Sequence, residues 1–184
     1  MHFVGIGLVT ALVGGWLVAL QPFLLLLVAA FVPLWGVGEY FVHRNLLHGD
    51  SVWRGLARDH GTHHVYFPAD DMYLADHVDV YRVLLRPQDV VAIELFVAVA
   101  AAAVTAAFGL GLGLVVATSA NLYALLYELA HAAAHLGSVA NRPGVARLAR
   151  HHRAHHAEIS DARRNFAIVF PWVDGWFGTR VGRR

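Results

Sequence analysis

The sequence predicts an all-α membrane protein, with four transmembrane helices arranged as two hairpins and a helical cap on one side of the bilayer. Three observations predict this fold class. Hydrophobic residues make up 58% of the 184 residues, which is above the usual share in soluble domains. Four apolar runs are each about long enough to cross ~30 Å of hydrocarbon. Ten of the 13 histidines fall into four short clusters. The length suits one domain over residues 1–184.

The first predicted hairpin pairs residues 2–20 with residues 23–42. The first run carries no charge after His2, and Gln21-Pro22 interrupts it at a point where proline is well placed to begin a second helix. A cleavable signal peptide is the alternative for this run. It is disfavoured because the run has no basic start and no clear polar stretch follows it.

The second hairpin pairs residues 89–108 with residues 112–135, across a short break at Gly109-Leu110-Gly111. Between the hairpins, residues 43–87 are rich in Asp, Arg and His and should lie outside the bilayer. Residues 141–164 are polar and rich in Arg. Residues 165–177 are aromatic and apolar but too short to span a membrane.

The distribution of charge orients these spans. Four spans place both termini on one side, and every Arg lies in the middle segment or the C-terminal segment. The positive-inside tendency makes that side cytoplasmic, so all four histidine clusters should lie on the cytoplasmic face. All 14 basic residues are Arg, and Ala, Val and Gly are abundant. This usage suggests a bacterial protein of the inner membrane.

Composition also excludes several classes of protein. The chain has no cysteine, which rules out disulfides, iron–sulfur clusters and cysteine-based zinc sites. The formal net charge is only +1, and no basic block is interleaved with aromatic residues, so no nucleic-acid partner is expected.

The spacing of the histidines indicates a metal site. Two clusters read HxxHH, a spacing that places the imidazoles on one side of a helix. A third pair, HxxxH, lies one helical turn apart at the end of the last span. His43 and His48 are five residues apart and can converge only if the helix ends or bends between them. The ten predicted ligands are His43, His48, His60, His63, His64, His131, His135, His152, His155 and His156.

Ten imidazoles are too many for one ion, whereas two ions with about five nitrogen ligands each would use the set. Imidazole binds Fe, Zn, Cu and Ni alike. Many neutral ligands beside long apolar spans favour iron and O2 chemistry on lipid C–H bonds, and zinc can replace iron in purified protein. Glu39, Asp59 and Glu128 precede histidines by three or four residues and could orient them as hydrogen-bond acceptors.

The other histidines have simpler interpretations, and the sequence leaves three other classes of protein open. His2 and His77 are expected to be structural, and His151 is expected to be an extra member of its cluster. The alternatives are a loose metal buffer or transporter, a membrane haem protein with two histidine ligands, and a zinc hydrolase. The last lacks the HExxH motif.

At these residues the chain resembles the fatty acid hydroxylase/sterol desaturase superfamily of membrane-bound di-iron oxygenases. The resemblance covers nearly the whole chain. The matching pieces are Glu39-Tyr40-Phe41-Val42-His43-Arg44 through His48, Asp59 to His64, Tyr127-Glu128 through His135, His152 to His156, and Asn165 to Pro171 followed by Asp174 and Phe177-Gly178-Thr179.

The resemblance implies that the ten histidines hold two iron ions in a cap over the bilayer. It implies an O2-dependent monooxygenase that hydroxylates, or desaturates, a lipid such as a fatty acyl chain or a sterol. A carotenoid hydroxylase of the same superfamily is the alternative, although those enzymes usually space the third pair one residue wider than His131 and His135. Since 184 residues leave no room for the fused haem carrier of some relatives, electrons are expected from a separate donor protein.

Overall fold

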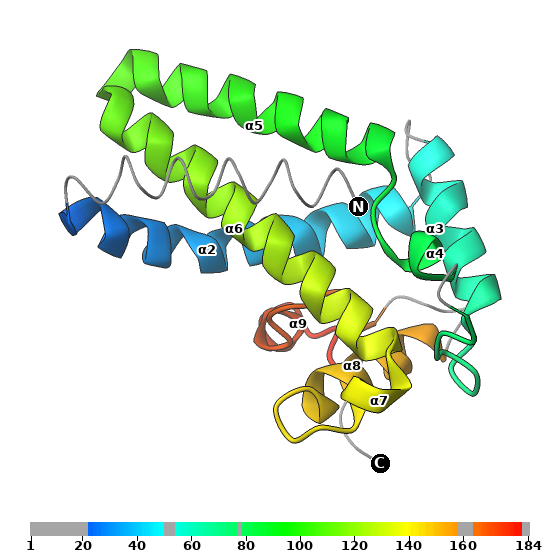
Figure 1. Ribbon diagram of the computed structural model, residues 1–184. Coiled ribbons are helices and arrows are strands. Elements are labelled where there is room, and N and C mark those ends of the chain that lie inside the picture. Colours follow the sequence, from blue (N-terminus) through cyan, green and yellow to red (C-terminus); the bar gives the residue numbers. More distant parts are fainter. Residues whose placement is uncertain (1–21, 50–53, 77–78, 158–163, 182–184) are drawn as a thin grey trace. The chain divides into compact units, whose positions relative to one another are not determined.

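The computed structural model describes residues 22–49, 54–76, 79–157 and 164–181. Within these ranges all regular structure is helical, which confirms the all-α prediction for the described part (Figure 1). The first predicted span, residues 2–20, lies outside them. The described residues divide into two compact units, one within residues 22–35 and 85–126, the other within residues 36–84 and 127–181.

Three helices have the length and composition of membrane spans. Helix α2 (Pro22–Val42) continues as the π-helix η1 (His43–Leu47). Helices α5 (Pro87–Phe108) and α6 (Leu110–His135) form the second predicted hairpin. Three of the four predicted spans are therefore confirmed by length and composition.

The hairpin of α5 and α6 turns at one residue. Gly109 has φ 92° and ψ 162°, a conformation that is essentially open only to glycine. Several large apolar side chains of helix α5 are exposed. Among them are Leu95, Phe96 and Val99, which are 63%, 65% and 69% exposed. Exposed apolar surface of this extent is what a lipid-facing helix requires.

Close packing within the hairpin depends on Gly113 of α6. A Cβ atom there would lie 1.8 Å from Thr105 Oγ1 and 2.8 Å from the Ala101 carbonyl oxygen. A backbone oxygen cannot move aside as a side chain can. Small residues permit this approach of two helix backbones in a membrane.

Gly113→Ala is therefore expected to lower the stability of the protein by about 1–3 kcal/mol, the usual cost of overpacking. The measurement is the melting temperature in detergent. Gly38→Ala is the matched control, because a Cβ on Gly38 of α2 meets nothing within 4 Å. Equal melting temperatures for the two variants would contradict the close packing of α5 on α6.

The first unit also joins α2 to α6. Leu24 and Val28 pack on Val115, and Trp35 Nε1 donates a hydrogen bond to Ser119 Oγ at 3.0 Å. The indole N–H therefore has its acceptor within the unit and is not left facing hydrocarbon.

The second unit consists of short helices and loops around the histidines. Its helices are α3 (Arg54–Tyr66), α4 (Val80–Val83), α7 (Gly137–Ala140), α8 (Ala146–His156) and α9 (Trp172–Trp176). Three small apolar clusters hold these pieces together, and their buried members are Phe67, Met72 and Val83; Ala134, Ala140 and Ala149; and Tyr40, Phe166, Ala167 and Val173. Each core is small, so the positions of the histidines depend strongly on hydrogen bonds.

Candidate metal centre

The ten predicted histidines come together as two groups of five, and in each group the ligand nitrogens lie within 4.8 Å of one another. The first group is His43, His48, His60, His64 and His155, and the second is His63, His131, His135, His152 and His156. The groups are adjacent, since the rings of His64 and His156 stack with their centroids 4.3 Å apart. This grouping matches the five nitrogens per ion expected from the sequence.

The π-helix η1 brings His43 and His48 together. The His48 N–H donates to the His43 carbonyl oxygen at 3.2 Å, an i→i+5 bond that places residues five apart above one another. The two rings stack with centroids 5.2 Å apart. The sequence required the helix to end or bend between these residues, and the structure widens the helix by one residue per turn instead.

Each HxxHH motif contributes to both groups. On α3, His60 and His64 join the first group while His63 joins the second. On α8, His152 and His156 join the second group while His155 joins the first. The i,i+4 pair therefore stays together, and the remaining histidine reaches the neighbouring group. The sequence indicated a shared helical side but not this division.

Backbone carbonyls orient five of the rings through Nδ1. The bonds are His43 to Phe166 at 2.6 Å, His63 to Arg82 at 3.0 Å, His135 to Met72 at 2.6 Å, His155 to Arg164 at 2.8 Å and His156 to Phe67 at 2.6 Å. A carbonyl oxygen only accepts, so the proton of each neutral ring must be on Nδ1. Nε2 is then left with a free lone pair.

The Nε2 atoms converge at hydrogen-bond distance, and the available protons are too few for all of these contacts. His43 Nε2 lies 3.0 Å from His60 Nε2, and His135 Nε2 lies 3.0 Å from His152 Nε2. His60 Nε2 is also 2.9 Å from His48 Nε2 and 3.0 Å from His64 Nε2. A neutral imidazole has one N–H and cannot satisfy several such contacts. Buried nitrogens without any hydrogen-bond partner, such as Nε2 of His63 and of His131, add to this set. The donor atoms therefore fit a metal cation in each group.

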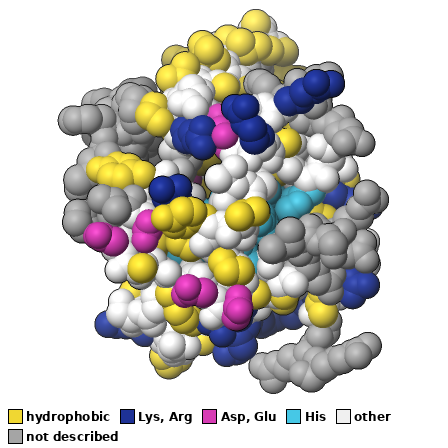
Figure 2. Space-filling view, turned by 90° about the vertical axis from the view of Figure 1, so that its right-hand side faces the viewer, with side chains coloured by type: hydrophobic (Ala, Val, Ile, Leu, Met, Phe, Trp, Pro, Cys, Tyr) yellow, Lys and Arg dark blue, Asp and Glu magenta, His cyan; other side chains and the backbone are white. Residues whose placement is uncertain are grey.

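Burial keeps the histidines of the second unit neutral, which is the form that binds metal. Desolvation lowers the pKa of His48 to about 4 and that of His63 to about 4. The pKa of His64 falls to about 2, first through burial and then through the charge of neighbouring histidines. The centre is still reachable, because His48 and His60 are only partly buried and Figure 2 shows histidine side chains at the surface.

These pKa values predict an acid-sensitive protein once metal is removed. Unfolded histidines take up protons as the pH falls below 6.5, whereas folded His63 resists protonation until about 4. The unfolded state therefore binds more protons in this window, and stability falls with the pH by up to ~1.4 kcal/mol per pH unit for each such histidine. We expect the melting temperature of metal-stripped protein in detergent to fall steadily from pH 7 to pH 4.5. A constant melting temperature would contradict the burial of neutral imidazoles.

Glu39 lies beside His43, as the sequence suggested, and the orienting roles of Glu39, Asp59 and Glu128 remain predictions. Glu39 Oε1 lies 3.6 Å from His43 Nδ1, but the hydrogen bond goes to the Phe166 carbonyl. The Glu39 carboxylate instead accepts the Ile168 N–H, 3.3 Å from each oxygen. Likewise, His63 Nδ1 donates to Arg82 and not to Asp59. Of the remaining histidines, His2 and His77 lie outside the described residues.

His151 belongs to neither group. Its Nε2 lies 3.0 Å from Oδ2 of the buried Asp174. Apart from the resemblance of the segment Asn165 to Thr179, no sequence pattern indicates this pair. The carbonyl acceptors were also missed, because any residue type can supply a carbonyl and no side-chain pattern marks the ones that do.

The class of protein follows from these features. The described part is an all-helical chain with three membrane-length helices and two adjacent groups of five histidines that could each hold a metal ion. The family model for fatty acid hydroxylase matches residues 25–179, which include all ten histidines. The chain belongs to this family, part of the fatty acid hydroxylase/sterol desaturase superfamily of membrane oxygenases. No curated protein and no solved structure matches the chain significantly.

Proposed function

We propose that the protein is a membrane-bound, O2-dependent di-iron oxygenase that hydroxylates or desaturates a lipid such as a fatty acyl chain or a sterol. One observation carries this proposal: two adjacent groups of five histidines direct their nitrogens toward two common centres. Membership of the fatty acid hydroxylase family supports the reaction class. The electrons are proposed to come from a separate donor protein.

The ten histidines would hold the two irons, one in each group. Iron bound there supplies the redox chemistry that activates O2 toward an unactivated C–H bond. The residues of the chain orient the imidazole rings around the ions. Nδ1–H bonds to carbonyls such as those of Met72 and Phe67 fix the ring planes and the tautomers. Burial limits water at the centre and keeps the imidazoles free of protons.

The position of the centre next to membrane spans favours an apolar substrate. His43 continues directly from α2, and His131 and His135 lie in the last turns of α6. Ligands on two membrane-length helices keep the centre near the end of the hydrocarbon layer. The exposed Arg142, Arg147 and Arg150 belong to the same unit, and the positive-inside tendency supports a cytoplasmic location for it.

Isotope labelling tests the proposed reaction. The gene is expressed in a bacterial host under 18O2, and the membrane lipids are compared by mass spectrometry with those of cells that express His60→Ala. Hydroxylation predicts one 18O atom in a lipid product made only by the wild type, and desaturation predicts the loss of two hydrogens without label. Labelled carotenoids would select the carotenoid hydroxylase alternative. Identical lipids and carotenoids from both strains, with each protein folded in the membrane and an electron donor co-expressed, would contradict the proposal.

A further inference from the structure

A short segment near the C-terminus, residues 164–168, supplies carbonyl acceptors to the first histidine group, and we call it the tail. The carbonyl of Phe166 accepts from His43 Nδ1 at 2.6 Å, and the carbonyl of Arg164 accepts from His155 Nδ1 at 2.8 Å. The second group receives its acceptors from elsewhere, namely Phe67, Met72 and Arg82. Among the hydrogen bonds of the described residues, the tail therefore orients the first group selectively.

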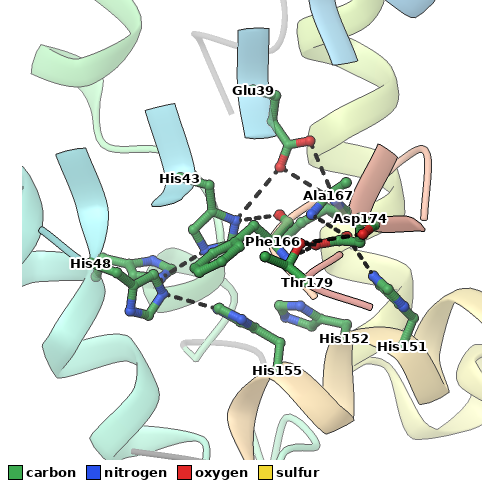
Figure 3. Close-up of polar contacts among 12 residues, drawn as sticks. Glu39, His43, His48, His151, His152, His155, Phe166, Ala167, Asp174 and Thr179 are labelled. Carbon is green, nitrogen blue, oxygen red and sulfur yellow. Dashed lines mark hydrogen bonds and ion pairs between the residues drawn. The ribbon is translucent and has the colours of Figure 1, made fainter. Parts of the chain in front are cut away.

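Asp174 of α9 holds this segment in place. Its Oδ1 accepts the Phe166 N–H at 2.8 Å and the Thr179 hydroxyl at 2.8 Å, and its Oδ2 accepts the Ala167 N–H at 2.9 Å. The fourth donor is His151 Nε2 at 3.0 Å. The side chain is fully buried, at 0% exposed, and Figure 3 shows it between the tail and His151.

Asn165 makes a second connection between the tail and α8. It adopts φ 57°, the left-handed conformation that Asn tolerates better than most residues. Its side chain donates to the His151 carbonyl at 3.3 Å and accepts the Val181 N–H at 2.8 Å. His151 is thus held at both its ring and its carbonyl, so α8 and the tail are fixed to each other.

We propose that Asp174, held by His151, is a positioning residue for the first metal ion. Phe166 is the link, because its N–H is bound by Asp174 and its carbonyl by His43. The Asp174 carboxylate fixes the position of the Phe166 backbone. The Phe166 carbonyl then fixes the orientation of the His43 ring. His151 holds Asp174 by a hydrogen bond and is not itself a metal ligand. This inference rests on the proposed function only in that the first group must hold an ion.

A single substitution can remove the acceptor function of Asp174 while nearly keeping the shape of its side chain. All four partners of Asp174 are donors, and a carboxylate can accept from all of them. Asparagine has nearly the same shape, but its NH2 group would face two of these donors. Asp174→Asn is therefore expected to displace the tail without leaving a cavity.

The test uses a background that retains only the first ion. His135→Ala removes a ligand of the second group, so this variant is expected to hold one metal ion per chain, counted as iron plus zinc by elemental analysis. Adding Asp174→Asn is expected to lower the content to near zero. Adding Asp79→Asn is the matched control and is expected to leave one ion, because Asp79 is a buried carboxylate of the same unit that contacts Asp76 and Arg82 instead of the tail.

Further combinations assign the effect to one group. Asp174→Asn with His43→Ala should still hold one ion, since both changes affect the first group. The inference is overturned if the variant with Asp174→Asn and His135→Ala keeps its ion. It is also overturned if the variant with Asp174→Asn and His43→Ala loses both ions while still folded. Folding is checked by helical circular dichroism and by size-exclusion chromatography in detergent.

A milder variant keeps the inference testable if Asp174→Asn does not fold. His151→Ala removes one of the four donors and should speed the loss of the first ion to a chelator by ~10–100-fold, the usual effect of losing a partner that orients a ligand. An unchanged rate would overturn the inference. A folded wild type without any metal would instead contradict the proposed function itself.

Discussion

Alanine at His155 or at His152 is expected to abolish O2-dependent lipid oxidation, down to the level of cells without the protein. The two histidines lie one helical turn apart on α8 but belong to different groups, so each variant should lose one ion and keep the other. In the proposed di-iron reaction both ions would take part in O2 activation, so the loss of either ion should stop oxidation. Lipid product analysis measures the activity, and elemental analysis measures the remaining metal.

Arg147→Ala is the matched control for these variants. Arg147 is on the same helix but exposed, and it belongs to neither histidine group. We expect it to retain full activity and both ions. Normal product from His155→Ala or His152→Ala, or the loss of both ions in a folded single variant, would show that the two groups do not work as separate sites of one centre.

Glu39→Ala is expected to slow product formation by ~10–100-fold, the usual effect of removing a partner next to a metal ligand. The carboxylate holds the Ile168 N–H and lies 3.6 Å from His43 Nδ1. Its loss removes the acceptor of the buried Ile168 N–H, next to the N–H groups that Asp174 binds. The measurement is the rate of product formation per mole of bound iron, which separates slower chemistry from lost metal.

Two further variants control the Glu39 experiment. Glu39→Gln keeps an acceptor oxygen for Ile168 and should recover most of the rate. Glu94→Gln changes an acid on α5 that belongs to neither histidine group and should leave the rate unchanged. If Glu39→Gln were as slow as Glu39→Ala, charge and not the hydrogen bond would be the contribution of this residue. If Glu39→Ala were as fast as the wild type, the role of Glu39 would be contradicted.

The sequence predicted the helical class, three described spans and about five histidine ligands for each of two ions, because each of these depends on side-chain pattern. It did not predict which histidine joins which group. Apolar runs of membrane length have few alternatives in water or lipid. Histidines at i and i+4 share one helical side whatever surrounds them, as His60 with His64 and His152 with His156 show. Such local geometry follows from the helix alone.

What the sequence could not predict depends on the backbone of distant segments. The π-helix at His43–Leu47 needs one extra residue per turn, and no residue type in HRNLL requires it. The orienting acceptors are carbonyls of Phe67, Met72, Arg82, Arg164 and Phe166, which lie between 9 and 123 residues from their histidines. Acids near in sequence looked like better partners, but His63 Nδ1 donates to the carbonyl of Arg82 in helix α4, which is 19 residues away.

The metal content of the purified wild type tests the central claim most directly. Protein expressed with iron is extracted in mild detergent, shown to be folded, and analysed for its elements. Two histidine groups predict two metal ions per chain, as iron, or as zinc where zinc has replaced iron during expression. A folded protein with no stoichiometric metal, or with one ion that survives both His155→Ala and His152→Ala, would contradict the account.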